Sequence, residues 1–234
     1  MIRLVHRKMT VVLLAGLLAA CASGQDTGPG LSADVFGAVR EVVKSRRDGP
    51  PPVTIVTPQM LAQTTTAALQ VNPEVKGGSD FLRRVAARND SVPGTVEVWN
   101  SSDNAQIFLR NGVVVGTRGI GGDIIAADAN VTVRALRTRA ATRGIRVYTV
   151  SDGDATSTAY TFQCTISRLG TEQISIVNLA FVTEHMVEEC TGGSDGKERI
   201  RNDYWVQSSD GLVRKSRQWV GPRTGYFELV LLKN

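Results

Sequence analysis

Short apolar stretches follow one another along most of the chain, and clusters of Gly, Asp and Ser separate them. Short strands that end at such turns are typical of an antiparallel all-β domain. No helix of the length that a parallel crossover requires recurs between the stretches, so we do not expect a parallel sheet. The pattern predicts a mainly β domain, an antiparallel curved sheet or a sandwich with an N-terminal helix. The predicted strands are residues 53–56, 81–88, 95–100, 106–110, 113–117, 145–150, 159–168, 172–178, 180–189, 200–207, 212–220 and 226–232.

Two helices are predicted near the N-terminal end. Ser32 is a suitable N-cap, an apolar stripe at helical spacing follows it, and Gly49 with the prolines at 50–52 ends the helix. The stripe consists of Val35, Phe36, Val39, Val42 and Val43. We expect this helix to bury the stripe against the domain; a partner helix or the bilayer surface is the alternative. Thr57 and Pro58 have the sequence of a cap and a first-turn proline, which predicts a second, short helix over 59–64.

A third helix is expected between the strands, over residues 130–143. Arginines stand at positions 134, 137, 139 and 143 of this segment. They do not share one face, which favours a helix surrounded by solvent.

The N-terminus has the layout of a secretory signal that ends in a lipid-modified cysteine. Arg3, Arg7 and Lys8 form a basic start, and the uncharged run 9–20 ends in small residues. That run is too short for a permanent membrane span, which needs about 20 apolar residues. The sequence L-A-A-C at 18–21 resembles the bacterial lipobox, in which the peptide is cut before a diacylated cysteine. We expect residues 1–20 to be a signal peptide and Cys21 to carry lipid; a plain signal with a chance cysteine is the alternative.

Lipid on Cys21 predicts a soluble domain that is held at a membrane by its first residue, because two or more acyl chains anchor a protein stably. Residues 21–31 are then a lipidated tether, small, polar and flexible. Ala22, not aspartate, follows the cysteine. By resemblance to enterobacterial lipoproteins, this favours the outer membrane. We therefore expect a periplasm-facing protein in which residues 32–234 form a single mainly β domain.

Charge and histidine content exclude several classes of function. The formal net charge is +5, but Arg3, Arg7 and Lys8 lie in the predicted signal. The remaining excess is small, so we expect no nucleic-acid partner. His6 also lies in the signal, which leaves His185 alone and excludes a multi-histidine metal site; no metal or other cofactor is expected. A Ser-His-Asp triad would have to use His185, for which a structural role is the simpler interpretation.

Cys164 and Cys190 remain when Cys21 is assigned to lipid. An even pair of cysteines in an oxidising compartment favours a disulfide. The bridge would close a loop of about 27 residues and stabilise the fold by roughly 3 kcal/mol on the chain-entropy model. Two buried free thiols are the alternative.

The most unusual local sequence is T-R-G-I-G-G-D at 117–123, which follows the strong hairpin signal Asn111-Gly112. It is not a dinucleotide fingerprint, since Ile124 replaces the third glycine and no βαβ unit surrounds it, and it lacks the G-K-[ST] of a phosphate loop. Its glycines are expected to allow positive φ, a bulge or the close approach of another backbone or a ligand. Arg118 and Asp123 are placed to pair across the turn.

A second cluster consists of N-D-Y-W-V at 202–206 and S-R-Q-W-V-G-P at 216–222. A hairpin about the turn 208–211 would bring Trp205 and Trp219 into neighbouring strands. Indole rings beside arginine suit sugar recognition, because the ring stacks on a sugar and the guanidinium binds hydroxyls or carboxylates. The alternative places both tryptophans in the core. With TRGIGGD, these strands define a candidate polysaccharide or partner surface: Arg118, Asp123, Tyr204, Trp205, Arg217 and Trp219.

The lipobox, TRGIGGD, the cysteine pair, NDYWV and SRQWVGP together resemble the YjbF/GfcB family, the group 4 capsule and exopolysaccharide lipoproteins of Gram-negative bacteria. The resemblance implies a mostly β outer-membrane lipoprotein that acts in exopolysaccharide production or export. It also implies partners, which are an outer-membrane β-barrel protein and periplasmic export proteins, with the polysaccharide itself as a candidate ligand. It implies no catalytic residues.

These observations predict a non-enzymatic lipoprotein that helps assemble or export a polysaccharide. One alternative is a periplasmic polysaccharide lyase or hydrolase. Hydrolysis requires two carboxylates roughly 5–10 Å apart across a cleft, and Glu184, Glu188 and Asp123 are the available candidates. The other alternative is a structural lipoprotein that only scaffolds a barrel partner.

Overall fold

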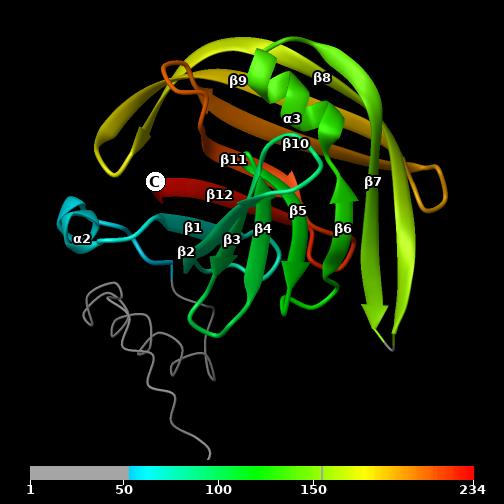
Figure 1. The fold of residues 1–234 in the computed structure, drawn as a ribbon, viewed down its shortest axis with the longest axis horizontal. Coiled ribbons are helices and arrows are strands. Elements are labelled where there is room, and N and C mark those ends of the chain that lie inside the picture. Colours follow the sequence, from blue (N-terminus) through cyan, green and yellow to red (C-terminus); the bar gives the residue numbers. More distant parts are fainter. Residues whose placement is uncertain (1–52, 154) are drawn as a thin grey trace, which may run out of the picture.

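The computed structural model describes residues 53–153 and 155–234, which contain two helices and twelve strands (Figure 1). The helices are α2 (Pro58–Gln63) and α3 (Asn130–Thr138). The strands are β1 (Ala68–Pro73), β2 (Asp80–Asn89), β3 (Thr95–Asn100), β4 (Gln106–Arg110), β5 (Val113–Arg118), β6 (Ile124–Asp128), β7 (Thr142–Gly153), β8 (Thr156–Ile176), β9 (Leu179–Gly193), β10 (Glu198–Gln207), β11 (Val213–Trp219) and β12 (Tyr226–Lys233). The signal, Cys21, the tether and the helix predicted after Ser32 lie outside the described residues.

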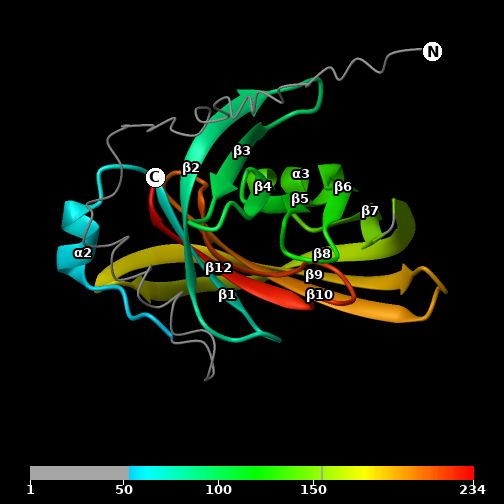
Figure 2. The same cartoon turned by 90° about the horizontal axis from the view of Figure 1, so that it is seen from below.

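All twelve strands form one antiparallel sheet in the order β5-β4-β3-β2-β1-β12-β11-β10-β9-β8-β7-β6. The sheet curls until β2 to β5 lie opposite β8 to β10 (Figures 1 and 2). Its edge strands β5 and β6 meet at a seam, where the Ile124 amide donates to Thr117 Oγ1 at 2.9 Å. No backbone ladder joins these two strands in the described chain. The predicted mainly β antiparallel fold is therefore confirmed, as a nearly closed, barrel-like sheet.

Strand periodicity explains the core. Successive side chains point to opposite faces of a strand. In β8 the residues Tyr160, Phe162, Cys164 and Ile166 are buried, and their neighbours in sequence are mostly exposed. Equivalent residues from the other strands complete a single hydrophobic cluster inside the curl. The predicted disulfide Cys164–Cys190 is present on this inner face, between directly opposed residues of β8 and β9.

Helix α3 connects β6 to β7 and packs against β7 (Figure 1). Val133, Ala135 and Leu136 are buried, whereas Arg134 and Arg137 are exposed. The prediction of a solvated helix over 130–143 is therefore wrong on two counts. One face is part of the core, and the helix ends at residue 139, which adopts a left-handed conformation before β7 begins.

The other predicted elements agree with the structure except at a few places. The strand predicted over 53–56 is absent. Ile55 is 82% exposed, and no strand of the described residues pairs with this segment. The two strands predicted at 159–168 and 172–178 are one strand, β8, because Gly170 adopts φ 144° at a bulge instead of ending the ladder. Strands β1 and β6 were not predicted. The short helix α2 is confirmed, with Thr57 as its N-cap.

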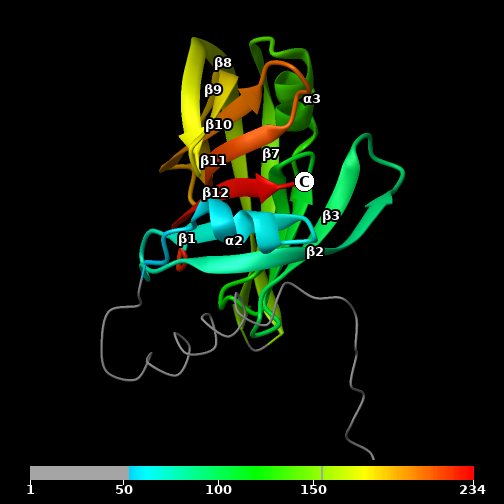
Figure 3. The same cartoon turned by 90° about the vertical axis from the view of Figure 1, so that its left-hand side faces the viewer.

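No helix in the described part of the chain is long and apolar enough to span a bilayer. The β2–β3 hairpin leans away from the body of the sheet (Figure 3). The turn end of β2 is exposed, whereas Val96 near the start of β3 is buried.

Candidate functional site

The residues predicted to form one surface lie on both faces of the sheet. In β10, Tyr204 points inward and is fully buried, while Trp205 points outward and is partly exposed. Trp219 is 5% exposed, and its ring meets the rings of Tyr148 and Phe162 edge-on at centroid distances of 4.9 and 5.7 Å. The predicted single surface is therefore wrong for Tyr204 and Trp219, which belong to the interior.

The inward-pointing polar residues form a buried network around Glu188. Its carboxylate accepts hydrogen bonds from Arg146 Nη1 at 2.9 Å, Asn202 Nδ2 at 2.8 Å and the Tyr204 hydroxyl at 3.2 Å. Thr132 of α3 donates to the other oxygen. Arg146 and Glu188 are 1% and 0% exposed, so this is a fully buried ion pair.

The electrostatics of the network follow from this burial. Burial opposes the charge on Arg146, but the Glu188 carboxylate outweighs it and raises the pKa of the guanidinium. Burial and the same carboxylate raise the pKa of the Tyr204 hydroxyl. The network therefore holds one charge pair and a neutral tyrosine.

The same network joins the edge strand β5 to β7 and β11. Arg146 of β7 donates to the Val114 carbonyl of β5 at 3.3 Å, and the Val114 amide donates to Gln218 Oε1 at 2.9 Å. Gln218 Nε2 donates to the Gly112 carbonyl at 2.8 Å. Side chains thus satisfy backbone groups of β5 that no neighbouring strand pairs, which indicates a structural role for the network.

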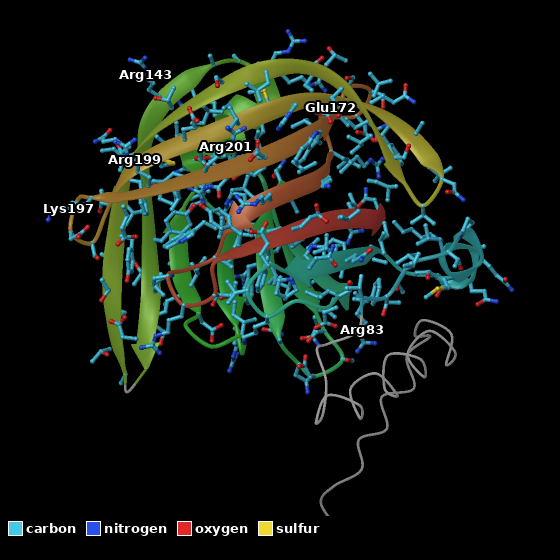
Figure 4. The ribbon with its side chains drawn as sticks, turned by 180° about the vertical axis from the view of Figure 1, so that it is seen from behind. Arg83, Arg143, Glu172, Lys197, Arg199 and Arg201 are labelled. Atoms are coloured by element: carbon cyan, nitrogen blue, oxygen red, sulfur yellow. A yellow bond between two sulfur atoms is a disulfide. The ribbon has the colours of Figure 1, made fainter. Side chains whose placement is uncertain are left out.

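The outward-pointing residues of β8 to β10 form a second cluster, centred on His185. Its ring lies between Asp203, at 2.9 Å from Nε2, and Glu172, at 3.2 Å from Nδ1. Trp205 stacks on the ring at a centroid distance of 4.4 Å and donates to Glu172 at 2.8 Å. Figure 4 shows Glu172 and Arg201 on this outer face. Burial opposes ionisation of Asp203, but hydrogen bonds from Arg201 and His185 outweigh it and lower the pKa of that carboxyl.

Arg217 also lies on the outer face, and its charge is compensated. It binds Glu74 through two nitrogens, at 2.6 and 2.7 Å, and lies over the Tyr226 ring.

His185 has an aspartate partner, as a catalytic triad requires. Glu172 lies at its other ring nitrogen and Trp205 lies on its ring face, so no nucleophile completes a triad there. The arrangement favours a structural role for His185.

The TRGIGGD turn is organised by Asp123. Its carboxylate accepts from the amides of Gly119 at 2.9 Å and Ile120 at 3.1 Å, and from Thr117 Oγ1 at 3.2 Å. Gly119, with φ 81°, adopts the left-handed conformation expected of glycine in this turn. In the described chain Arg118 forms no salt bridge with Asp123, so the predicted pairing across the turn is wrong. Backbone amides donate to the Asp123 carboxylate instead.

The motifs TRGIGGD and SRQWVGP come close to each other at their glycines. Their charged and aromatic residues do not meet. A side chain on Gly221 would lie 3.4 Å from the Gly122 carbonyl, and Thr224 Oγ1 donates to the Gly121 carbonyl at 3.0 Å. Lys76, from the β1–β2 loop, donates to the Ile120 carbonyl at 3.2 Å. Three loops distant in sequence therefore gather at one end of the sheet.

Two of these loops, the β1–β2 loop and the TRGIGGD turn, border a cavity of about 330 Å³, which we call the loop-end cavity. Its lining comes from β1, the β1–β2 loop, β2, the β3–β4 loop, β4, the TRGIGGD turn and β12. Its residues include Val71, Lys76, Leu82, Ala105, Ile107, Ile120 and Phe227. TRGIGGD was singled out from sequence, but the loops 76–79 and 101–105 were not. Their only signal is the Gly, Ser and Asp content of ordinary turns.

A second cavity, of about 320 Å³, lies between the β2–β3 hairpin and strands β11 and β12; we call it the hairpin cavity. It is lined by Arg84, Ala87, Glu97 and Trp99, with Leu69, Leu109, Leu229 and others from the core. Arg84 and Glu97 form a salt bridge at 2.5 Å on its wall. Neither cavity contains Trp205, Arg217 or Trp219.

The three carboxylates considered for hydrolysis are not arranged for it. Glu184 and Glu188 are four residues apart on β9, which corresponds to about 13 Å along a strand. Glu188 is fully buried in its ion pair, Glu184 is bound to Arg168, and Asp123 is held by the TRGIGGD amides.

Comparison with known proteins gives three findings. The model of the family described as "Group 4 capsule polysaccharide lipoprotein gfcB, YjbF" matches residues 36–232. The chain is 28% identical over 138 residues to the uncharacterized lipoprotein GfcB of Escherichia coli K12. That match covers 58% of this chain and spans 64% of the relative's length. The crystal structure of the hypothetical lipoprotein YmcC from E. coli K12 is similar, with a TM-score of 0.66 at 22% identity, over 87% of this chain and 96% of that one. This last likeness establishes a common fold.

Proposed function

The chain belongs to the YjbF/GfcB family of group 4 capsule polysaccharide lipoproteins, and we propose that it helps assemble or export an exopolysaccharide or capsule without being an enzyme. In this proposal it is anchored by lipid on Cys21 in the outer membrane and faces the periplasm. The observation that carries the proposal is the family match over 36–232, directly downstream of a lipobox. Lipoprotein relatives support a lipid-anchored, membrane-associated protein.

A binding or scaffolding role fits the polar groups of the described residues better than catalysis does. Glu188, Asp123 and Glu184 each have a cation or a set of donors bound to them. These three carboxylates therefore do not supply the general acid and general base that a hydrolase or lyase needs. In this proposal the partners are an outer-membrane β-barrel protein and periplasmic export proteins.

Complementation in the host tests the role. Deletion of the gene is expected to lower the amount of polymer at the cell surface, and the wild-type gene should restore it. A Cys21→Ser variant is expected to fail, since it cannot be lipidated, and radiolabelled palmitate should enter only the wild type. Unchanged surface polymer after deletion would contradict the proposal.

A separate assay addresses the enzymatic alternative. The purified protein is incubated with the host's own polymer, and the chain length is followed by size-exclusion chromatography. We expect no shortening. Cleavage by the wild type that a Glu184→Gln variant lacks would establish the hydrolase or lyase instead.

A further inference from the structure

The loop-end cavity has apolar walls that come from segments far apart in the sequence. Val71 of β1, Leu82 of β2, Ile107 of β4 and Phe227 of β12 are each at most 4% exposed and supply its inner part. Ile120 of the TRGIGGD turn adds a further wall. A volume of about 330 Å³ falls within the range of small-molecule sites, roughly 300–1,000 Å³.

The polar groups beside these walls already have protein partners. Ser101 Oγ donates to the Ala105 carbonyl at 3.1 Å and to Asp103, and Ser79 Oγ accepts from Gln70 at 3.4 Å. A molecule inside the cavity therefore finds few unused hydrogen-bonding groups at depth. Cavities of this kind hold water poorly and accept apolar molecules.

Charged groups lie in the loops at the entrance and at the start of β2, where the half-buried Asp80 accepts from the Phe81 amide at 2.8 Å. Lys76 and Asp103 are exposed, and among the described residues Lys76 donates only to the neutral Ile120 carbonyl. The cavity is therefore amphipathic along its depth, apolar within and polar at its rim. A ligand with an apolar body and a polar end matches this order.

This chemistry distinguishes the loop-end cavity from a sugar site. Sugars require many hydrogen-bonding partners and an accessible ring to stack on. The aromatic side chain that lines the cavity in the described structure, Phe227, is 4% exposed and packed in the core. The hairpin cavity is different, because Arg84, Glu97 and Trp99 give it a mixed lining.

We propose that the loop-end cavity binds a single aliphatic chain, the acyl chain of a lipid, with its polar end at the rim beside Lys76. The acyl chain could come from the protein's own lipid on Cys21 or from a separate lipid molecule. The cavity presents the same apolar walls to both. The proposal is independent of the capsule role, since it concerns what the cavity holds and not what the cell exports.

Photo-crosslinking in the host tests the proposal on the full-length protein. Cells that express it are fed a fatty acid with a diazirine in its chain and irradiated, and adducts are mapped by mass spectrometry. We expect adducts on peptides that contain Leu82, Ile107 and Ile120. The adduct mass identifies the source, because the protein's own anchor yields a crosslink to the N-terminal peptide of Cys21, whereas a separate lipid adds only its own mass. In Cys21→Ser the first kind disappears and the second persists.

A matched pair of variants tests the location. Ala105→Leu places three additional carbons at the loop-end cavity, and Ala87→Leu makes the same change at the hairpin cavity. Exclusion of about two methylene groups predicts a roughly tenfold fall in adduct yield for Ala105→Leu. Ala87→Leu is expected to leave the yield unchanged, and both variants should melt close to the wild type.

Three outcomes would overturn the proposal. One is the absence of adducts on loop-end peptides in the folded wild type. Another is an adduct pattern confined to the hairpin cavity. The third is an equal yield in Ala105→Leu and wild type. Because the readout is a crosslink, none of these outcomes depends on whether the protein acts in capsule export.

Discussion

Strands β9 and β10 carry two polar clusters on their opposite faces, and the clusters use similar residues. The inner cluster pairs Glu188 with Arg146, beside Tyr204. The outer cluster pairs Asp203 with Arg201 and His185, beside Trp205. Adjacent residues of one strand thus enter two environments, one fully buried and one partly exposed to solvent.

The comparison teaches that water, not residue type, determines what each contact contributes to stability. A buried charge that loses its partner retains its full desolvation penalty, whereas an exposed charge regains solvent. Truncations on the inner face should therefore be far more destabilising than equivalent truncations on the outer face.

The largest difference is expected between Glu188→Gln and Glu189→Gln. The first leaves the Arg146 guanidinium buried without a carboxylate, and breaking such a pair lowers the free energy of unfolding by about 3–5 kcal/mol. Glu189 is the next residue, and its side chain is 64% exposed, so its substitution should stay within about 0.5 kcal/mol. Urea denaturation measures both. A loss below about 1 kcal/mol for Glu188→Gln would refute the distinction between the faces.

The two tryptophans provide a second test. Trp219→Ala removes a ring that is packed against the aromatic rings of Tyr148, Tyr160 and Phe162, and should destabilise by about 3–5 kcal/mol. Trp205→Ala removes a ring stacked on His185 at the surface, with an expected loss of about 1 kcal/mol. Thermal unfolding followed by circular dichroism measures both losses. Equal losses would place the two rings in the same environment, contrary to the structure.

Acid unfolding tests the outer cluster. The folded pKa of Asp203 is lowered below its unfolded value, which is about 3.9. Its contribution to stability is therefore present above that unfolded value and is lost as pH falls through the folded pKa. Asp203→Asn should remove this part of the acid dependence below about pH 4. Identical acid curves for the two proteins would show that the carboxyl is not stabilised by folding.

The smallest effect is expected for Arg217→Ala. The Arg217–Glu74 pair is partly exposed, and pairs of this kind contribute about 0.2–1 kcal/mol. The loss should shrink at high salt because the exposed charges are screened. Denaturation at low and high ionic strength measures it, and a salt-independent loss above about 2 kcal/mol would mean that the pair behaves like the inner one.

Much of the fold could be predicted from local sequence signals. Asn111-Gly112 marks the β4–β5 turn, and both residues have positive φ. The turn 208–211 joins β10 to β11, as the Ser, Asp and Gly content predicts. Cys164 and Cys190 form the predicted bridge. The two turns depend on a few neighbouring residues, and the disulfide depends on the pairing of two cysteines. Tertiary packing does not change either kind of feature.

The candidate surface could not be predicted in the same way. Asp203 faces Arg217 in the β10–β11 ladder, and simple alternation from Arg217 would place Trp219 on the outer face. The ladder ends there, however, and the Trp219 amide donates to the Asn202 side chain at 2.7 Å while the ring packs inward. The loop-end cavity escaped prediction for another reason, since its walls are brought together only when the sheet curls.

The strand order has a consequence for how the chain folds. The first and last strands, β1 and β12, are neighbours in the middle of the sheet, whereas the consecutive strands β5 and β6 form its two edges. The meander β1–β5 therefore attaches to the rest only after the C-terminal strand has emerged, a long-range contact of the kind that slows folding. A circular permutant that joins the C-terminus to Ala67 and opens at the TRGIGGD turn would be a simple up-and-down meander of twelve strands. Its pairings would all be between neighbours in the new sequence, so we expect it to refold faster than the natural order.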